Sequence, residues 1–163
     1  YYIPIGINEK HLIHFLLSHA KKYHKEVFEK IFGEFNEAKW HRIIVIASII
    51  QKEAANVDEM PLVSSVIYNR LKKDMKLQMD GTLNYGQYSH VKVTPARIKE
   101  DTSSYNTYMY KGLPPHAIGS VSKEAIFAAI YPKQTNYLYF VKNKNGTHSF
   151  TQNYETHLEN IRN

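Results

Sequence analysis

The chain has 163 residues, of which 43 % are hydrophobic and none is cysteine, and it carries a formal net charge of +6 at pH 7. This length and apolar content predict one folded domain with a substantial core, and they exclude a disordered chain. The lack of cysteine excludes disulfides and thiolate metal sites. The positive charge indicates an acidic partner, for which nucleic acid, anionic lipid and an anionic wall polymer all stay open.

The first part of the sequence predicts three helices. Apolar residues recur at helical spacing over residues 8–32, and Gly33 can end that helix. Asn36 is a suitable N-cap for a second helix, which we expect to run to about Ala55. A third helix is predicted over residues 61–73, with a proline in its first turn. The longest apolar run lies in the second helix and is far shorter than the roughly 20 residues that span a bilayer.

The second part predicts loops, a helix, a hairpin and a last helix. Residues 74–115 are rich in Gly, Pro, Tyr and Asn, a composition typical of long ordered loops with short strands. A helix is expected over residues 122–130, and then a hairpin with Asn145 and Gly146 in its turn. The final helix is expected over residues 153–161. The fold class is therefore α+β, with helices packed around a small antiparallel sheet and a long Tyr-rich ordered loop region lining the active cleft.

The second helix ends in a carboxyl group, that of Glu53, which is a candidate general acid. In the stretch "ASIIQKEA", Glu53 lies on the same helical face as Ile46 and Ile49, so it leans over apolar surface near the helix C-terminus. Burial and the helix dipole both raise a carboxyl pKa, which suits a general acid near neutral pH. Gln51 cannot donate a proton and is left a hydrogen-bonding role. The alternative is that Glu53 simply emerges from the core and is solvated.

Two further tracts carry polar side chains that could bind a ligand. On the third helix, Asn69 and Arg70 can reach toward the central loop, although a plain helix surface explains them equally well. Gln78, Asp80 and Thr82 occupy alternate positions, so an extended backbone would turn all three side chains the same way. That arrangement would present polar groups to a sugar. The alternative is the polar face of an edge strand before an Asp-Gly turn.

A cluster of tyrosines lies in the same central region. Tyr105, Asn106, Tyr108 and Tyr110 precede a rigid Pro-Pro pair. Aromatic rings stack on the apolar faces of sugars and amides bind their hydroxyl groups, so the cluster can form a carbohydrate-binding wall; packing against the core is equally open. We expect no cofactor and no metal, because no pair of histidines has convincing metal-ligand spacing.

Several motifs together resemble one enzyme family. "ASIIQKEA", "PLVSSVIYNRL", "KLQMDGTLNYG", "SYNTYMYKGLPPHAIGSVSKEAIFAAIYP" and "NYLYFV" followed by "THSF" have the order and spacing of the YceG-like (MltG) endolytic murein transglycosylases. The match covers residues 43–157. The resemblance implies that Glu53 is the catalytic acid, as the second Glu of a Glu-Lys-Glu signature. It also implies that His148 of "THSF" belongs to the site. The candidate substrate-binding residues are Gln51, Asn69, Arg70, Gln78, Asp80, Thr82, Tyr105, Asn106, Tyr108 and His148.

The sequence departs from the family pattern at a few positions. Gln51 replaces the first Glu of the signature, which affects a supporting role and not the acid itself. Met79 and Gly81 stand where the family often has Thr and Pro around Asp80. His116 stands where Gly is common after the double proline. These differences can alter substrate contacts or loop stiffness while the acid is kept.

The resemblance implies cleavage of the β-1,4 bond between N-acetylmuramic acid and N-acetylglucosamine, with closure of a 1,6-anhydro ring. Glu53 would act first as acid and then as base, with Gln78, Asp80 and Asn106 orienting the sugar. One alternative is a two-carboxylate glycosidase, in which Asp80 or Asp101 is the second group. Others are a noncatalytic glycan- or nucleic-acid-binding module and a family member that has lost activity, which only Gln51 favours.

The resemblance also implies a cellular setting. We expect residues 1–163 to form a single catalytic domain, the C-terminal portion of a longer membrane-anchored protein whose anchor is absent from this sequence. The expected location is the bacterial cell envelope, at the periplasmic face of the inner membrane. Expected partners are peptidoglycan glycan strands and wall-synthesis enzymes at that membrane. Nucleic acid is not an expected partner, since the tyrosines are not interleaved with Lys and Arg in a recognition motif.

Overall fold

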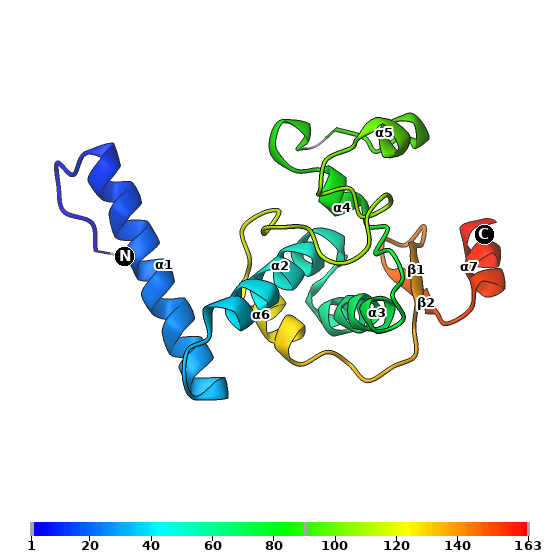
Figure 1. Cartoon of the computed structure of the whole chain (residues 1–163), viewed down its shortest axis with the longest axis horizontal. Helices are drawn as coiled ribbons and strands as arrows, with labels where there is room; N and C mark the ends of the chain where they lie inside the picture. Colours follow the sequence, from blue (N-terminus) through cyan, green and yellow to red (C-terminus); the bar gives the residue numbers. More distant parts are fainter. Residues whose placement is uncertain (1, 90, 163) are drawn as a thin grey trace. The chain divides into compact units, whose positions relative to one another are not determined.

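A computed structural model describes residues 2–89 and 91–162 of the chain (Figure 1). The chain divides into two compact units, with the boundary between Trp40 and His41. The first unit contains one long helix, and the second contains most of the helices and the sheet. In the described part of the chain, no helix combines the length and the apolar character that crossing a membrane requires.

The long helix of the first unit is α1 (Glu9–Phe32). It begins at Asn8, whose side chain accepts a hydrogen bond from the backbone of His11, and it ends at Gly33, where φ is 85°. A positive φ suits glycine, which has no Cβ to clash. Both ends agree with the boundaries that the sequence predicts.

Helix α2 (Glu37–Glu53) carries the apolar run into the second unit. Its N-cap is Asn36, whose Oδ1 accepts a 2.8 Å hydrogen bond from the backbone N–H of Lys39. Nearly every residue from 43 to 50 is buried, which makes this helix the centre of the core. Because α2 ends at Glu53, its last carboxyl group lies where the core meets the surface.

Two further helices of the second unit pack against each other. The short turn η1 (Val57–Glu59) leads into α3 (Met60–Lys72), which has Pro61 in its first turn as predicted. Helix α6 (Lys123–Ile130) begins at the N-cap Ser122 and packs against α3 (Figure 1). The buried faces of these helices complete the apolar core.

The central region differs from the expectation of short strands. Its described residues form short helices instead: α4 (Asp80–Leu83), η2 (Gly86–Tyr88) and α5 (Pro95–Glu100). Thr94 caps α5 through its side chain, and the following proline favours the first helical turn. Local capping and turn hydrogen bonds therefore satisfy this backbone where the composition suggested strands.

The sheet is a single antiparallel hairpin of β1 (Tyr139–Lys142) and β2 (His148–Thr151). Gly146 lies in the turn with φ 88°, and its N–H donates to the carbonyl of Asn143. Helix α7 (Tyr154–Arg162) follows at once and packs on the hairpin (Figure 1). Helices with one small antiparallel sheet confirm the predicted α+β class.

Candidate active site

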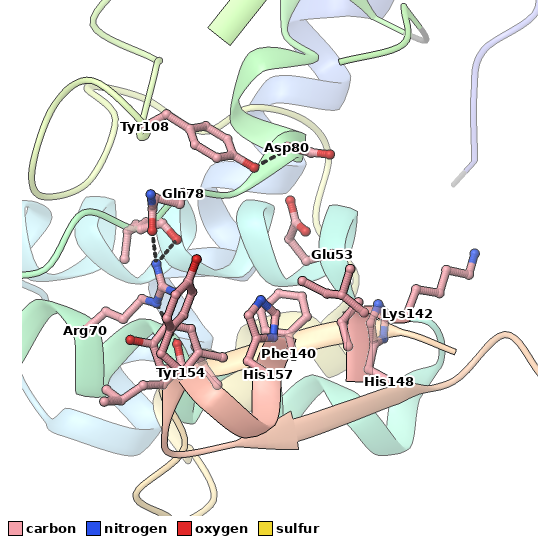
Figure 2. A pocket seen from close by; sticks show the side chains of 16 residues that line it. Glu53, Arg70, Gln78, Asp80, Tyr108, Phe140, Lys142, His148, Tyr154 and His157 are labelled. Carbon is pink, nitrogen blue, oxygen red and sulfur yellow. Dashed lines mark hydrogen bonds between the residues drawn. The ribbon is translucent and has the colours of Figure 1, made fainter. Parts of the chain in front are cut away.

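A cleft of about 570 Å³ opens in the second unit, where the end of α2 meets the residues before and in α4, the hairpin and α7 (Figure 2). Its wall contains apolar, aromatic and ionisable side chains. The polar groups used below are Glu53, Arg70, Gln78, Asp80, Tyr108 and His148. The cleft therefore gathers side chains from segments that are far apart in the sequence.

Glu53 is the partly buried carboxyl group of this cleft. Its Oε1 accepts a 2.6 Å hydrogen bond from the backbone N–H of Gly81. Burial raises the pKa of Glu53 to about 7; the Gly81 hydrogen bond opposes that shift, and the negative charge of Asp80 adds to it. A carboxyl group with this pKa exchanges a proton readily near neutral pH.

Asp80 and Tyr108 form a hydrogen-bonded pair beside Glu53 (Figure 2). The hydroxyl group of Tyr108 donates to Oδ1 of Asp80 over 2.6 Å. Burial and this hydrogen bond raise the pKa of Tyr108, so its hydroxyl keeps its proton. The hydroxyl group of Tyr108 thus fixes the side chain of Asp80, which lines the same cleft as Glu53.

Arg70 is 6 % exposed and braces the cleft floor. Its guanidinium hydrogen bonds go mainly to backbone carbonyl groups, and one goes to the side chain of Gln78 over 3.0 Å. The several N–H donors of this one guanidinium group thus link the loop before α4 to the start of the hairpin. The carbonyl acceptors are those of Lys76, Leu77 and Leu138.

The structure corrects the expectation that Gln78, Asp80 and Thr82 face one way from an extended segment. The backbone of Gln78 has a φ of 53°, and α4 begins two residues later, so the alternation of a strand is lost. Gln78 and Asp80 reach the cleft, whereas Thr82 is fully buried. The Thr82 hydroxyl donates to the carbonyl of Met79, so this side chain stabilises the local backbone and does not reach the cleft.

Asn106 is also fully buried and organises the Tyr-rich loop. Its side-chain amide donates to the carbonyl groups of Ile98 and Asp101, and its carbonyl accepts the backbone N–H of Tyr108. The predicted direct contact of Asn106 with a sugar does not fit this position. The residue instead holds the segment from which Tyr108 reaches into the cleft.

Three other predicted residues lie outside the cleft lining. The side-chain carbonyl of Gln51 accepts the backbone N–H of Ser122 over 3.0 Å, at the start of α6. Asn69 donates to two carbonyl groups of the segment that leads into β1. Tyr105 stacks on Tyr85, with ring centroids 4.5 Å apart, beside a separate hollow. The structure thus gives these side chains packing or bracing contacts.

His148 lines the cleft and is held by a residue that the sequence analysis missed. Its Nδ1 lies 2.7 Å from Oε2 of Glu59, and its backbone N–H donates to Oε1 over 2.8 Å. Burial would raise the pKa of Glu59, but the hydrogen bonds from His148 and Ala55 outweigh that effect and lower it. Glu59 stays a carboxylate, so Nδ1 carries the shared proton.

The hairpin and α7 supply further cleft residues that were missed: Tyr139, Phe140, Lys142, Tyr154 and His157. The alternation of β1 and the aromatic residues that begin α7 were the available signals, but they did not show which cleft these elements face. Burial and the nearby charge of Arg70 lower the pKa of His157, which favours a neutral ring. Among the described residues, no three His, Asp or Glu side chains gather as a metal site.

An α+β unit with a proton-exchanging carboxyl group in an open cleft is suited to acid-base cleavage of a polymer. The profile of the YceG-like family matches residues 1–163, and the chain belongs to this family. It is 37 % identical over 122 residues to the endolytic murein transglycosylase of Bacillus subtilis strain 168, covering 75 % of this chain and 34 % of that protein.

Other relatives agree with this assignment. The endolytic murein transglycosylase of Streptococcus pneumoniae D39 is 32 % identical over 127 residues, 74 % of this chain and 23 % of that protein. A crystal structure of a YceG-like protein from Listeria monocytogenes matches with a TM-score of 0.80 at 32 % identity, over 97 % of this chain and 51 % of that one. The matched stretch of the chain thus spans between about a quarter and a third of the length of these curated relatives.

Proposed function

We propose that this chain is the catalytic part of an endolytic murein transglycosylase, with Glu53 as its general acid and base. The observation that carries this proposal is the partly buried Glu53 carboxyl group, whose pKa is raised to about 7 inside the cleft. The names of the relatives give the substrate class, peptidoglycan. Acid-base chemistry at one carboxyl group requires that it gain and lose a proton near the working pH.

In the first step, protonated Glu53 donates its proton to the glycosidic oxygen between N-acetylmuramic acid and N-acetylglucosamine. The bond from that oxygen to the anomeric carbon of the muramic unit breaks, and positive charge develops on the sugar ring. The carboxylate of Asp80, fixed by Tyr108, is suited to stabilise this charge. The leaving glucosamine unit carries the proton away on its new hydroxyl group.

In the second step, the Glu53 carboxylate removes the proton from the C6 hydroxyl group of the same muramic unit. The freed oxygen attacks the anomeric carbon and closes a 1,6-anhydro ring, which returns Glu53 to its protonated form. The hydrogen bond from Gly81 stabilises the carboxylate between the two steps. Water does not take part, so the mass of the strand is conserved.

The other accessible cleft residues have roles in substrate placement. Gln78, Tyr108 and His148 can offer hydrogen bonds to sugar hydroxyl and acetamido groups. Peptidoglycan strands are the proposed partner, and the proposed location is the cell envelope at the periplasmic face of the inner membrane, near wall-synthesis enzymes. The expectation of a single catalytic domain over residues 1–163 stays a prediction, with the cleft wholly in the unit that begins at His41.

The test is mass spectrometry of uncrosslinked glycan strands incubated with the protein and with Glu53→Gln. We expect strands ending in 1,6-anhydro-muramic acid from the parent and intact strands from the variant. Glu37→Gln is the matched control, since Glu37 is an exposed carboxyl group at the other end of α2. Near-normal turnover by Glu53→Gln would contradict the assignment of Glu53 as the general acid.

A two-carboxylate hydrolysis is the second candidate, because Asp80 lines the same cleft as Glu53. In that reaction a water molecule is added, and the products carry reducing ends that are heavier by the mass of water. Asp101, the other carboxylate considered, does not line this cleft but lies at neighbouring hollows. The same mass spectra distinguish the two reactions, and intact strands from the parent would favour a binding module.

A further inference from the structure

One edge of the cleft is formed by a cross-strand pair on the hairpin. Lys142 and His148 are direct partners in the antiparallel register, so their side chains project from the same face of the sheet. Both line the cleft that contains Glu53, and Figure 2 shows Lys142 reaching outward beside His148. We call Lys142 and His148 together the hairpin edge.

The imidazole of His148 is rigidly held. The side chains of His148 and Glu59 are only 9 % and 10 % exposed, and their contact fixes Nδ1 as the donor. The ring also packs edge-on against Phe140, with centroids 5.3 Å apart. Within residues 2–89 and 91–162, no hydrogen bond involves its Nε2, which carries no proton in this tautomer and is left to accept a hydrogen bond from a ligand in the cleft.

The ammonium group of Lys142 is not neutralised by the structure. It is exposed at the end of β1 and forms no ion pair with any described residue. Glu59, the acid beneath the hairpin edge, already accepts hydrogen bonds from His148 and Ala55. The other acids of the cleft are Glu53, whose raised pKa favours the neutral form, and Asp80, which is bound to Tyr108.

We propose that the hairpin edge binds a muramic unit of the glycan strand, with the ammonium group of Lys142 on a carboxylate and Nε2 of His148 accepting from a hydroxyl or amide N–H, and so distinguishes muramic from glucosamine units. This inference rests on the proposed function, because it takes a muramyl glycan as the ligand. N-acetylglucosamine is neutral, whereas N-acetylmuramic acid carries a lactyl group whose carboxylate is free in denuded strands. In peptide-bearing strands that group is an amide, and the carboxylates lie on the stem peptide.

The flexible ammonium group of Lys142 suits such a pendant carboxylate better than it suits ring hydroxyl groups. His148 Nε2, whose ring carries its proton on Nδ1, can accept a hydrogen bond from a hydroxyl or acetamido N–H of the same sugar unit. Recognition of every second sugar would set the register of the strand along the cleft. The glycosidic oxygen of a muramic unit, rather than that of a glucosamine unit, would then lie at Glu53. The hairpin edge therefore acts in specificity, while the proton transfers belong to Glu53.

Binding is measured by calorimetry in a Glu53→Gln background, which prevents turnover. The ligands are denuded muramyl oligosaccharides, peptide-bearing muramyl oligosaccharides and chitooligosaccharides of equal length. We expect Lys142→Gln to weaken binding of a muramyl ligand about five-fold, as for an exposed ion pair, and to leave chitooligosaccharide binding unchanged. Lys144→Gln is the matched control, because Lys144 is an exposed lysine in the hairpin turn outside the cleft lining.

Each outcome decides the proposal. A loss confined to denuded ligands identifies the lactyl carboxylate as the bound group, and a loss confined to peptide-bearing ligands identifies the stem peptide. An equal loss for chitooligosaccharides, an equal effect of Lys144→Gln, or no effect of Lys142→Gln overturns it. The proposed function is judged separately by the cleavage products of the parent, so a glycan-cleaving enzyme without this preference would contradict only the present inference.

Discussion

The backbone N–H of Gly81 donates to Oε1 of Glu53 over 2.6 Å, and a Cβ atom at Gly81 would lie 2.7 Å from that same oxygen. The Cβ would also lie 2.9 Å from Cβ of Lys52. Such contacts are too short to persist, so Gly81→Ala must displace the carboxyl group or the start of α4. We expect kcat/KM to fall at least about ten-fold, since catalytic groups need placement within about 0.5 Å.

Steady-state release of 1,6-anhydro ends measures this effect. Gly119→Ala is the control, because its added Cβ would meet only the flexible end of Lys52, at 3.4 Å. We expect the control to retain parental activity and both variants to keep the parental circular dichroism spectrum. Full activity of Gly81→Ala would contradict the tight placement of Glu53.

Activity should fall as the pH rises through the pKa of Glu53. The first step needs the protonated acid, and burial raises that pKa to about 7, so kcat/KM should drop about ten-fold per pH unit above it. The negative charge of Asp80 contributes to the raised pKa, so Asp80→Asn should move this fall to lower pH. A pH profile of the two proteins measures the shift, and a movement to higher pH would contradict the electrostatic coupling.

Stability should show the same titration. The folded pKa of Glu53 exceeds its ordinary value of 4.5, so the folded state binds more protons than the unfolded state between pH 4.5 and about 7. The contribution of Glu53 is therefore fully present below pH 4.5 and is lost as the pH rises to about 7. The loss is roughly 3 kcal/mol at most. Glu53→Gln should remove this dependence, as urea unfolding at pH 5 and pH 8 would reveal.

The Tyr108 hydroxyl group is expected to matter for catalysis more than for stability. Tyr108→Phe removes the 2.6 Å hydrogen bond that holds the carboxylate of Asp80 in the cleft, where the proposed mechanism needs it. We expect kcat to fall about ten-fold, with a loss of about 1 kcal/mol or less in unfolding free energy. Tyr110→Phe is the matched control, since its exposed hydroxyl bonds to the carbonyl of Thr102. Equal effects of both substitutions would exclude the assigned role.

Arg70 should tolerate no substitution, even by lysine. Lysine cannot reproduce the guanidinium fork, so Arg70→Lys would leave buried carbonyl groups without donors. We expect the unfolding free energy to fall by about 3 kcal/mol, measured by urea denaturation. Arg42→Lys, an exposed arginine on α2, should change it by less than about 0.5 kcal/mol. A mild effect at Arg70 would mean that the loop before α4 is held by other contacts.

The helices were predictable because their signals are local. Asn8, Asn36 and Ser122 cap the helices that follow them, and each cap lies within three residues of the N–H that it accepts. The apolar face of α2 likewise predicted that Glu53 would emerge over the core. Its role as the acid stays a prediction, although its burial and raised pKa agree with that role.

The central loop was not predictable in the same way, because its conformation depends on distant contacts. The positive φ of Gln78 breaks the expected alternation, and its backbone N–H bonds to the carbonyl of Thr107. Glu59 and His148 meet across 89 positions of sequence, which no local pattern indicates. Gly81 had been noted only as a departure from a common proline; its value as a hydrogen-bond donor, which proline cannot be, emerged from the fold.

The lining of the cleft begins with Glu53 and ends with Ile161, near the last described residue. During synthesis, helix α2 therefore leaves the ribosome long before the hairpin and α7 that complete the surroundings of Glu53. Glu59 cannot form its hydrogen bond with the imidazole ring of His148 until that residue has been added. A chain that stops before the hairpin would keep Glu53 but lack one wall of the cleft, so the cleft is completed only when the last part of the described chain has been made.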